Sequence, residues 1–157
     1  MDPKCYSEEI HRALADAGLA PSLHGTASVP GAPSAIIMEY LDPSAGWTTL
    51  QTYIREHPEI KINTKHPAFV QLFKIMKEKQ VVHGDLRPNN IMCRVQPESG
   101  TEGQGLEIKV VDFDWAGKSG SAKYPAIMNL AINWPGAPRG LIDEGHDETL
   151  LERTLSK

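Results

Sequence analysis

The sequence predicts one α+β domain, in which amphipathic helices and short strands share a hydrophobic core. Apolar residues recur at helical spacing in two separate stretches, near residues 8–17 and 67–79. Short runs rich in Val, Ile and Leu, bounded by Gly, Pro and polar residues, indicate strands that end in turns. With 157 residues, the chain suits one domain with its own core rather than two.

The composition disfavours several classes of partner. A formal net charge of −4 gives no reason to expect a basic surface for nucleic acid. The two cysteines, Cys5 and Cys93, do not form a disulfide framework of the secreted kind, so we expect reduced thiols in a cytoplasmic protein. Residues 1–4 lack the apolar core of a signal peptide, and no apolar run approaches membrane-spanning length. We therefore expect neither nucleic acid nor a membrane as a partner.

The first third of the chain predicts a helix followed by two strands. Ser7 is suited to cap the helix, and the acidic side chains of Glu8 and Glu9 favour its first turn, where the helix dipole attracts anions. Strands are expected at about 23–29 and 35–41, because a turn rich in Pro and Gly separates two β-prone runs.

The middle of the chain predicts two helices and then two strands. A short helix is expected over 49–56, and Pro67 suits the first position of a longer helix that runs to residue 79. Residues 91–95 and 106–111 have the composition of strands. The polar, Gly-rich residues 96–105 between them predict a mobile hairpin loop.

The last third predicts little regular structure before a final helix. Beyond Trp115 the chain is rich in Gly and Pro, so we expect mostly irregular backbone there. A final amphipathic helix is expected over 146–155. His146 and Asp147 are interpreted as the start of this helix rather than as metal ligands.

Polar residues that suit phosphoryl transfer lie around the two middle strands. His83, Asp85 and Asn90 form the pattern H-x-D-x-x-x-x-N just before the first strand, and Asp112 follows the second. An antiparallel pair places the start of its first strand beside the end of its second, so we expect Asn90 and Asp112 to be neighbours. An amide and a carboxylate held together provide oxygen ligands that suit Mg²⁺.

These motifs resemble those of the protein-kinase-like superfamily. Residues 83–90, HGDLRPNN, are similar to its catalytic loop, and Asp112-Phe113 is similar to the start of its metal-binding motif. Gly84 and Asp114 look more like the branch that contains choline kinases and aminoglycoside phosphotransferases. The resemblance implies a partial kinase-like fold, with an N-lobe helix and strands, a hinge, the helix before the catalytic loop and a β-hairpin that carries the metal site.

The resemblance implies a role for each residue of the motif. Asp85 corresponds to the catalytic acid/base, which orients the acceptor hydroxyl, and His83 supports the loop. Arg87 stands where protein-serine kinases have a Lys close to the transferred phosphate, so it is expected to neutralise charge there. Asn90 and Asp112 correspond to the Mg²⁺ ligands.

The resemblance also extends upstream of the loop. Glu39, Tyr40 and Leu41 look like the hinge that contacts the adenine of ATP. The helix that begins after Ser7 looks like the N-lobe helix, so Glu8 or Glu9 is expected to match its ion-pairing Glu.

The resemblance implies a domain that is trimmed at both ends. Residues 1–41 would be the residual N-lobe and hinge strand, and residues 42–157 a reduced C-lobe. The Gly-rich loop and the strand Lys that hold phosphates in the family are not recognisable in the sequence.

Three functions are therefore open at this point. The first is a Mg·ATP-dependent kinase that phosphorylates a hydroxyl of a protein or a small molecule. The second is a pseudokinase or a fragment that acts as a nucleotide- or protein-binding module, because the phosphate-holding parts are not visible. The third, a metal-dependent hydrolase, has little support because no ligand set for an activated water is recognisable.

Overall fold

The computed structural model describes residues 6–28, 30–31, 34–95 and 105–155. This part of the chain contains four α-helices and three small antiparallel sheets. The helices are α1 (Glu8–Ala15), α2 (Leu50–Glu56), α3 (Pro67–Glu78) and α4 (His146–Leu155). The strands are β1 (Leu23–Ala27), β2 (Ala35–Met38), β3 (Thr48–Thr49), β4 (Val81–Val82), β5 (Ile91–Val95), β6 (Leu106–Val110) and β7 (Gly117–Lys118).

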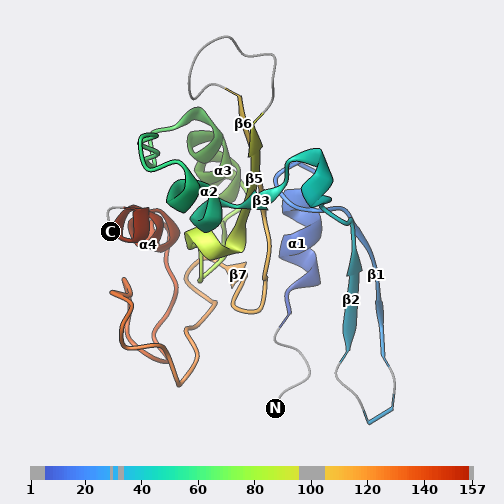
Figure 1. The fold of residues 1–157 in the computed structure, drawn as a ribbon. Helices are drawn as coiled ribbons and strands as arrows, with labels where there is room; N and C mark the ends of the chain where they lie inside the picture. The colour runs from blue at the N-terminus through green and yellow to red at the C-terminus, as the bar shows by residue number, and fades with distance from the viewer. Residues whose placement is uncertain (1–5, 29, 32–33, 96–104, 156–157) are drawn as a thin grey trace.

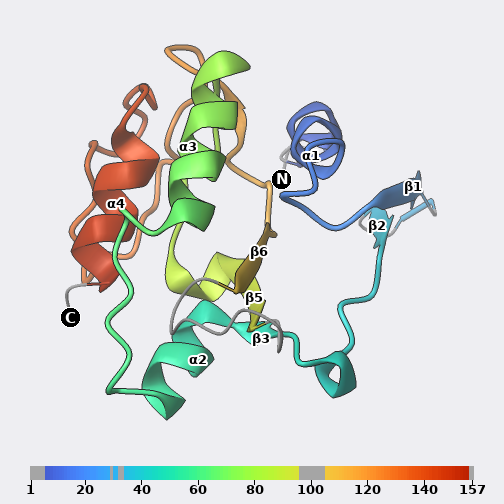
Figure 2. The same ribbon diagram turned by 90° about the horizontal axis from the view of Figure 1, so that it is seen from above.

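A three-stranded sheet in the order β3-β5-β6 lies at the centre of the molecule. Figures 1 and 2 show α2, α3 and α4 on one side of this sheet and α1 on the other. The β1–β2 hairpin extends beyond α1, away from the other helices (Figures 1 and 2). The remaining pair, β4-β7, joins the end of α3 to the segment that follows β6.

The register of β5 and β6 decides which residues meet at the two ends of this hairpin. Ile91 pairs with Val110 at one end, and Val95 pairs with Leu106 at the other. The residues directly before β5 and directly after β6 therefore lie side by side, as the sequence predicts. The predicted hairpin loop falls mainly on residues 96–104, which lie outside the described residues.

The main hydrophobic core joins α1, α3, α4 and the central sheet. Each element contributes side chains that its own apolar spacing directs inward. The most deeply buried members include Leu14, Phe69, Leu72, Ile91 and Leu151. Helices from both ends of the described chain contribute to this cluster. A second, smaller cluster of Val82, Tyr124, Met128 and Ile142 lies under the segment that follows β6.

The elements agree closely with those expected from the sequence, apart from the smallest strands. All four predicted helices and the four longer strands are present, and the segment after Trp115 is mostly turns. Ser7 precedes α1, but its side chain makes no capping hydrogen bond; its N–H donates to the Phe113 carbonyl instead, at 3.1 Å. The strands β3, β4 and β7 have two residues each, which is too short for a periodic pattern to reveal them.

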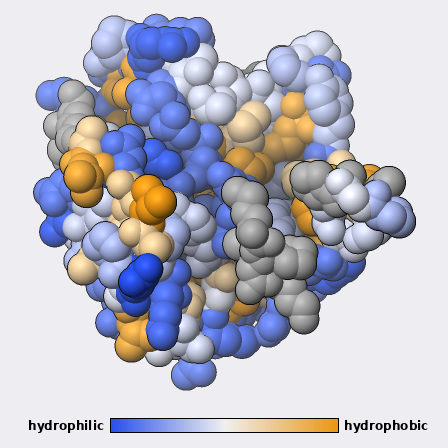
Figure 3. All heavy atoms as spheres, turned by 90° about the horizontal axis from the view of Figure 1, so that it is seen from below, coloured by the Kyte–Doolittle hydropathy of each residue, from blue (hydrophilic) through white to orange (hydrophobic). Residues whose placement is uncertain are grey.

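The described surface carries apolar side chains in separate patches. Viewed from below, apolar atoms lie between larger hydrophilic areas rather than in one continuous face (Figure 3). Ile127 and Leu130 are the most exposed large apolar side chains that the structure describes, at 89% and 90%. Within the described residues, no helix combines the length and the apolar character that crossing a membrane requires.

Gly84 occupies a crowded position with a left-handed backbone. Its φ is +84°, and a Cβ there would lie 2.8 Å from Ile142 Cδ1 and 3.0 Å from both the Cβ and the carbonyl oxygen of Trp115. Gly18, which follows α1, has a similar φ of +75° but nothing within 4 Å of such a Cβ. Comparing an alanine substitution at Gly84 with one at Gly18 therefore separates the free-energy cost of the left-handed backbone from the cost of crowding.

We predict that Gly84→Ala destabilises the protein more than Gly18→Ala. Both changes pay for a left-handed alanine, about 1–2 kcal/mol, and Gly84→Ala adds the overlap with Ile142 and Trp115, about 1–3 kcal/mol. The free energy of unfolding from urea titrations would measure both. Equal losses for the two variants would contradict the packing described for Gly84.

We predict that the Cys93 thiol is inert in the folded protein. The residue is fully buried in β5, and burial raises the pKa of its thiol to about 12, so almost no thiolate forms near neutral pH. In a Cys5→Ser variant, in which Cys93 is the remaining thiol, an aromatic disulfide reagent at pH 8 should react only after denaturant is added. Rapid reaction without denaturant would show that β5 is not packed as described.

Candidate active site

The carboxylate of Asp85 is held on two sides by its own loop. This loop connects β4 to the short 3-10 helix η2 (Pro88–Asn90). Arg87 forms a bidentate contact, with its Nε on Asp85 Oδ1 and its Nη2 2.8 Å from Oδ2. Asn90 Nδ2 donates to Asp85 Oδ2 at 3.1 Å and to the Asp85 carbonyl at 2.9 Å. The structure therefore brings together three of the residues that the sequence singled out.

His83 fixes the start of this loop against the strand β6. Its Nε2 lies 3.0 Å from the Val111 carbonyl, which can only accept, so Nε2 carries the ring proton. Its Nδ1 then accepts the N–H of Asp85 at 3.3 Å. The fully buried ring thus supports the loop, in line with the role expected of His83.

Asp147 holds the same loop from the first turn of α4. Its two carboxylate oxygens accept the N–H groups of His83, at 2.7 Å, and Gly84, at 2.9 Å. Burial raises the pKa of the Asp147 carboxyl, while the hydrogen bonds from the two N–H donors act in the opposite direction. From its local sequence Asp147 indicates only the start of a helix, because no local pattern reveals a partner more than 60 residues away.

Asn90 and Asp112 lie at neighbouring ends of the central hairpin. The N–H of Val111 donates to the Asn90 carbonyl at 2.9 Å, which extends the β5–β6 ladder to the residues that carry the site. The charge of Asp112 also contributes to raising the pKa of Arg87, after the larger effect of the hydrogen bonds to Asp85. The predicted proximity of Asn90 and Asp112 is therefore confirmed for their backbones.

Asp112 has a left-handed backbone that its neighbours maintain. Its φ is +70°, a conformation that Asp tolerates better than most residues. The Val111 hydrogen bond precedes it, and the fully buried ring of Phe113 follows it. These two anchors leave the Asp112 side chain exposed at the end of the strand.

The acidic side chains of Asp112 and Asp114 create a negative electrostatic field around them. Partial burial, and then the charge of Asp112, raises the pKa of Asp114. Burial also raises the pKa of the Tyr6 hydroxyl to about 12, with further contributions from Asp114 and Asp112. A cation bound between these carboxylates would relieve their mutual repulsion.

The ring of Phe113 lies between two histidines from different parts of the chain. His11 of α1 stacks on it with centroids 4.6 Å apart, and His83 meets it edge-on at 5.3 Å. His11 is itself fixed, because Nδ1 lies 2.6 Å from the Tyr6 hydroxyl and Nε2 lies 2.7 Å from the Pro21 carbonyl. Helix α1 is thereby packed directly against the residue that follows Asp112.

The donor atoms at this end of the hairpin fit Mg²⁺. Since Asn90 uses its Nδ2 to bind Asp85, its Oδ1 remains as the acceptor atom of the amide. Oδ1 and the Asp112 carboxylate are hard oxygen donors, and Mg²⁺ commonly takes one or two such protein ligands with waters and phosphates. Among the described residues, no group of three or more His, Cys, Asp or Glu side chains could hold a metal ion.

The strand expected over 35–41 ends at Met38, so the predicted hinge residues follow β2 rather than belong to it. The acidic residue among them has a structural partner. The Glu39 carboxylate accepts from Lys109 Nζ at 2.7 Å and from the Ser22 N–H at 3.0 Å, and these contacts lower the pKa of Glu39. The Glu39 N–H donates to the Ser22 carbonyl at 2.8 Å, so it is occupied. Tyr40 is 78% exposed, and Leu41 is half-buried.

The acidic residues of the first helical turn pair with two basic side chains near them. Glu8 lies 3.9 Å from Arg12 of the same helix, and Glu9 lies 3.0 Å from Lys118 of β7. All four side chains are about half or more exposed. Exposed pairs of this kind contribute little to stability.

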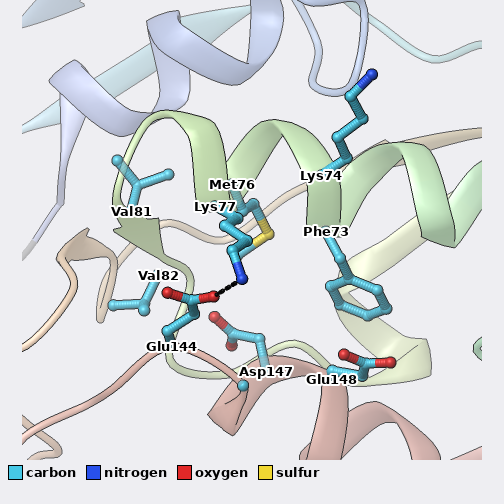
Figure 4. A pocket seen from close by; sticks show the side chains of 10 residues that line it. Phe73, Lys74, Met76, Lys77, Val81, Val82, Glu144, Asp147 and Glu148 are labelled. Atoms are coloured by element: carbon cyan, nitrogen blue, oxygen red, sulfur yellow. Dashed lines mark ion pairs between the residues drawn. The ribbon is translucent and has the colours of Figure 1, made fainter.

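A hollow of about 310 Å³ lies between α3 and α4, and Asp147 is one of the residues that line it. Phe73, Met76 and Lys77 of α3 line it, and Lys77 forms an ion pair at 2.7 Å with Glu144, another lining residue (Figure 4). Its described lining contains no residue that the sequence assigned to the site. The hollow therefore borders the support of the loop rather than the site itself.

Comparison with known proteins supports a kinase-like fold. No model of a known protein family matches the chain, and no curated protein sequence matches it either. Among solved structures, the chain is similar to the kinase PK-1 of the Cydia pomonella granulovirus, with a TM-score of 0.51 and 14% sequence identity. The match covers 82% of this chain but 44% of the viral kinase, so the chain spans less than half the length of that protein. At this level of identity the likeness shows the fold alone, and that fold is kinase-like.

Proposed function

We propose that the protein is an ATP- and Mg²⁺-dependent phosphotransferase of the protein-kinase-like superfamily, which phosphorylates a hydroxyl of a protein or a small molecule. One observation carries the proposal: the Asp85 carboxylate is fixed by Arg87 and Asn90 beside the strand end that bears Asp112, within a kinase-like fold. Phosphoryl transfer depends mainly on positioning and charge neutralisation, which are the properties of this arrangement.

In this proposal Asp85 acts on the acceptor. Its carboxylate accepts a hydrogen bond from the acceptor hydroxyl and takes the proton as the oxygen bonds to the γ-phosphorus, while the bond from that phosphorus to the leaving ADP oxygen breaks. Arg87, next to this carboxylate, offsets negative charge on the transferred group.

The other residues of the candidate site would bind the nucleotide and its metal ion. Asn90 Oδ1 and the Asp112 carboxylate would hold Mg²⁺, which neutralises the phosphates when it is bound. The adenine would contact the backbone of Glu39, Tyr40 and Leu41, through groups other than the occupied Glu39 N–H.

We also propose that residues 1–41 correspond to an N-lobe remnant and hinge, and residues 42–157 to a reduced C-lobe. A second candidate function is a nucleotide- or protein-binding module without turnover. The pairing of Glu9 with Lys118 favours it, because that glutamate is then engaged by a residue after Asp112 rather than by a phosphate-binding strand lysine.

We predict that Asp112→Asn weakens Mg²⁺-dependent ATP binding by about tenfold or more, equivalent to at least ~1.4 kcal/mol. Asn keeps the shape and tolerates the left-handed backbone, so the change removes mainly the charge. Calorimetric titration with ATP, with and without Mg²⁺, would measure the loss, and Asp16→Asn at the end of α1 is a matched control. Unchanged affinity, or no ATP binding by the unaltered protein at millimolar concentration, would refute the assignment.

We predict that Asp85→Asn lowers the rate of phosphate transfer by about 100-fold or more while ATP binding persists, since a positioned general base contributes on that order. The measurement is ADP release with pooled hydroxyl acceptors, alongside ATP affinity. Binding without any turnover in the unaltered protein would favour the binding module instead.

A further inference from the structure

Arg87 lies between the Asp85 carboxylate and an aromatic ring from a distant segment. Its guanidinium carbon is 5.4 Å from the centre of the Trp134 ring, on which it lies. The same group makes the bidentate contact with Asp85. An arginine held only by one carboxylate keeps much rotamer freedom, whereas a ring beneath it restricts that freedom and attracts its charge.

The Trp134 ring is itself fixed by several contacts. Its Nε1 donates to the Asn129 carbonyl at 2.8 Å, and its ring packs against Trp115, with centroids 5.2 Å apart, and Tyr124, with centroids 6.1 Å apart. Arg153 of α4 donates to the carbonyls of Asn133, at 3.2 Å, and Trp134, at 3.1 Å. The ring is therefore anchored on both its side-chain and its backbone atoms.

One helix thus supports both partners of Arg87. Asp147, in the first turn of α4, binds the backbone that leads to Asp85, and Arg153, in its last turn, binds the backbone of Trp134. Both partners of Arg87 are therefore tied to the two ends of one helix. Arg87 occupies the space between them.

We propose that Trp134 is a positioning residue that holds the Arg87 guanidinium on Asp85, where it can offset the charge of the transferred phosphate. The effect of Arg87 on the charge of the transferred phosphate rests on the proposed phosphotransferase function. The effect of Trp134 on the conformation of Arg87 does not. The two are separable by experiment.

The first test follows the Nε–H signal of Arg87 by NMR in the unaltered protein and in Trp134→Leu. We expect the signal to lose its ring-current shift and to exchange faster with water in the variant.

Trp47→Leu is the matched control, because Trp47 lies under a different arginine, Arg94, at 4.9 Å. That change should move the Arg94 signal and leave Arg87 unaffected. If Trp134→Leu does not fold, Trp134→Phe, which keeps a smaller ring, should give a partial shift. An Arg87 signal that is unchanged in a folded Trp134 variant would overturn the proposal, whether or not the protein is a kinase.

The second test is a double-mutant cycle on turnover. We expect Trp134→Leu to lower kcat about three- to tenfold, the effect of losing one cation–π contact, with little change in the KM for ATP. In an Arg87→Ala background the same change should have no further effect on kcat, because Trp134 acts through Arg87.

An equal loss in both backgrounds would show a structural role alone and overturn the positioning role. A protein without turnover would refute the proposed function, while the NMR result would still decide whether Trp134 holds Arg87.

Discussion

The two hydrogen bonds that Asp147 accepts from His83 and Gly84 are the contact on which the candidate site depends. They tie the first turn of α4 to the start of the loop, across more than 60 residues of chain. A buried carboxylate is costly unless its oxygens are satisfied, so this pair of N–H groups and the side chain stabilise each other. The left-handed backbone of Gly84, closely packed on Trp115 and Ile142, lets the loop turn at this point.

A second set of contacts couples the loop to the opposite side of the sheet. Phe113 packs on His83 and on His11, and its carbonyl accepts the N–H of Ser7 at the start of α1. Asp112 precedes this ring, so its position depends on both the helix and the loop. The kinase-like arrangement is therefore maintained by packing and backbone bonds around the charged residues, rather than by the charged residues alone.

Local patterns predicted the helices and the central hairpin because periodicity and turn chemistry are local properties. The proximity of Asn90 and Asp112 was also predictable, since it follows from antiparallel pairing alone. The roles of Asp147 and Trp134 were not, because both act on residues far away in the sequence. The engagement of the Glu39 N–H by Ser22 continues the antiparallel β1–β2 pairing, so the two predicted strands could have revealed it. Long-range pairing leaves no spacing rule in a single sequence.

The direction of the β5–β6 hairpin has a consequence for how the chain can vary. The Val95–Leu106 pair closes the β5–β6 ladder at the end opposite to Asn90 and Asp112. Lengthening the chain between two paired strands costs little, about 0.6 kcal/mol for each doubling of its length. The paired residues of β5 and β6 lie between such an insertion and the strand ends that carry Asn90 and Asp112. Insertions, fluorescent labels or affinity tags placed there should leave the geometry of the charged end intact.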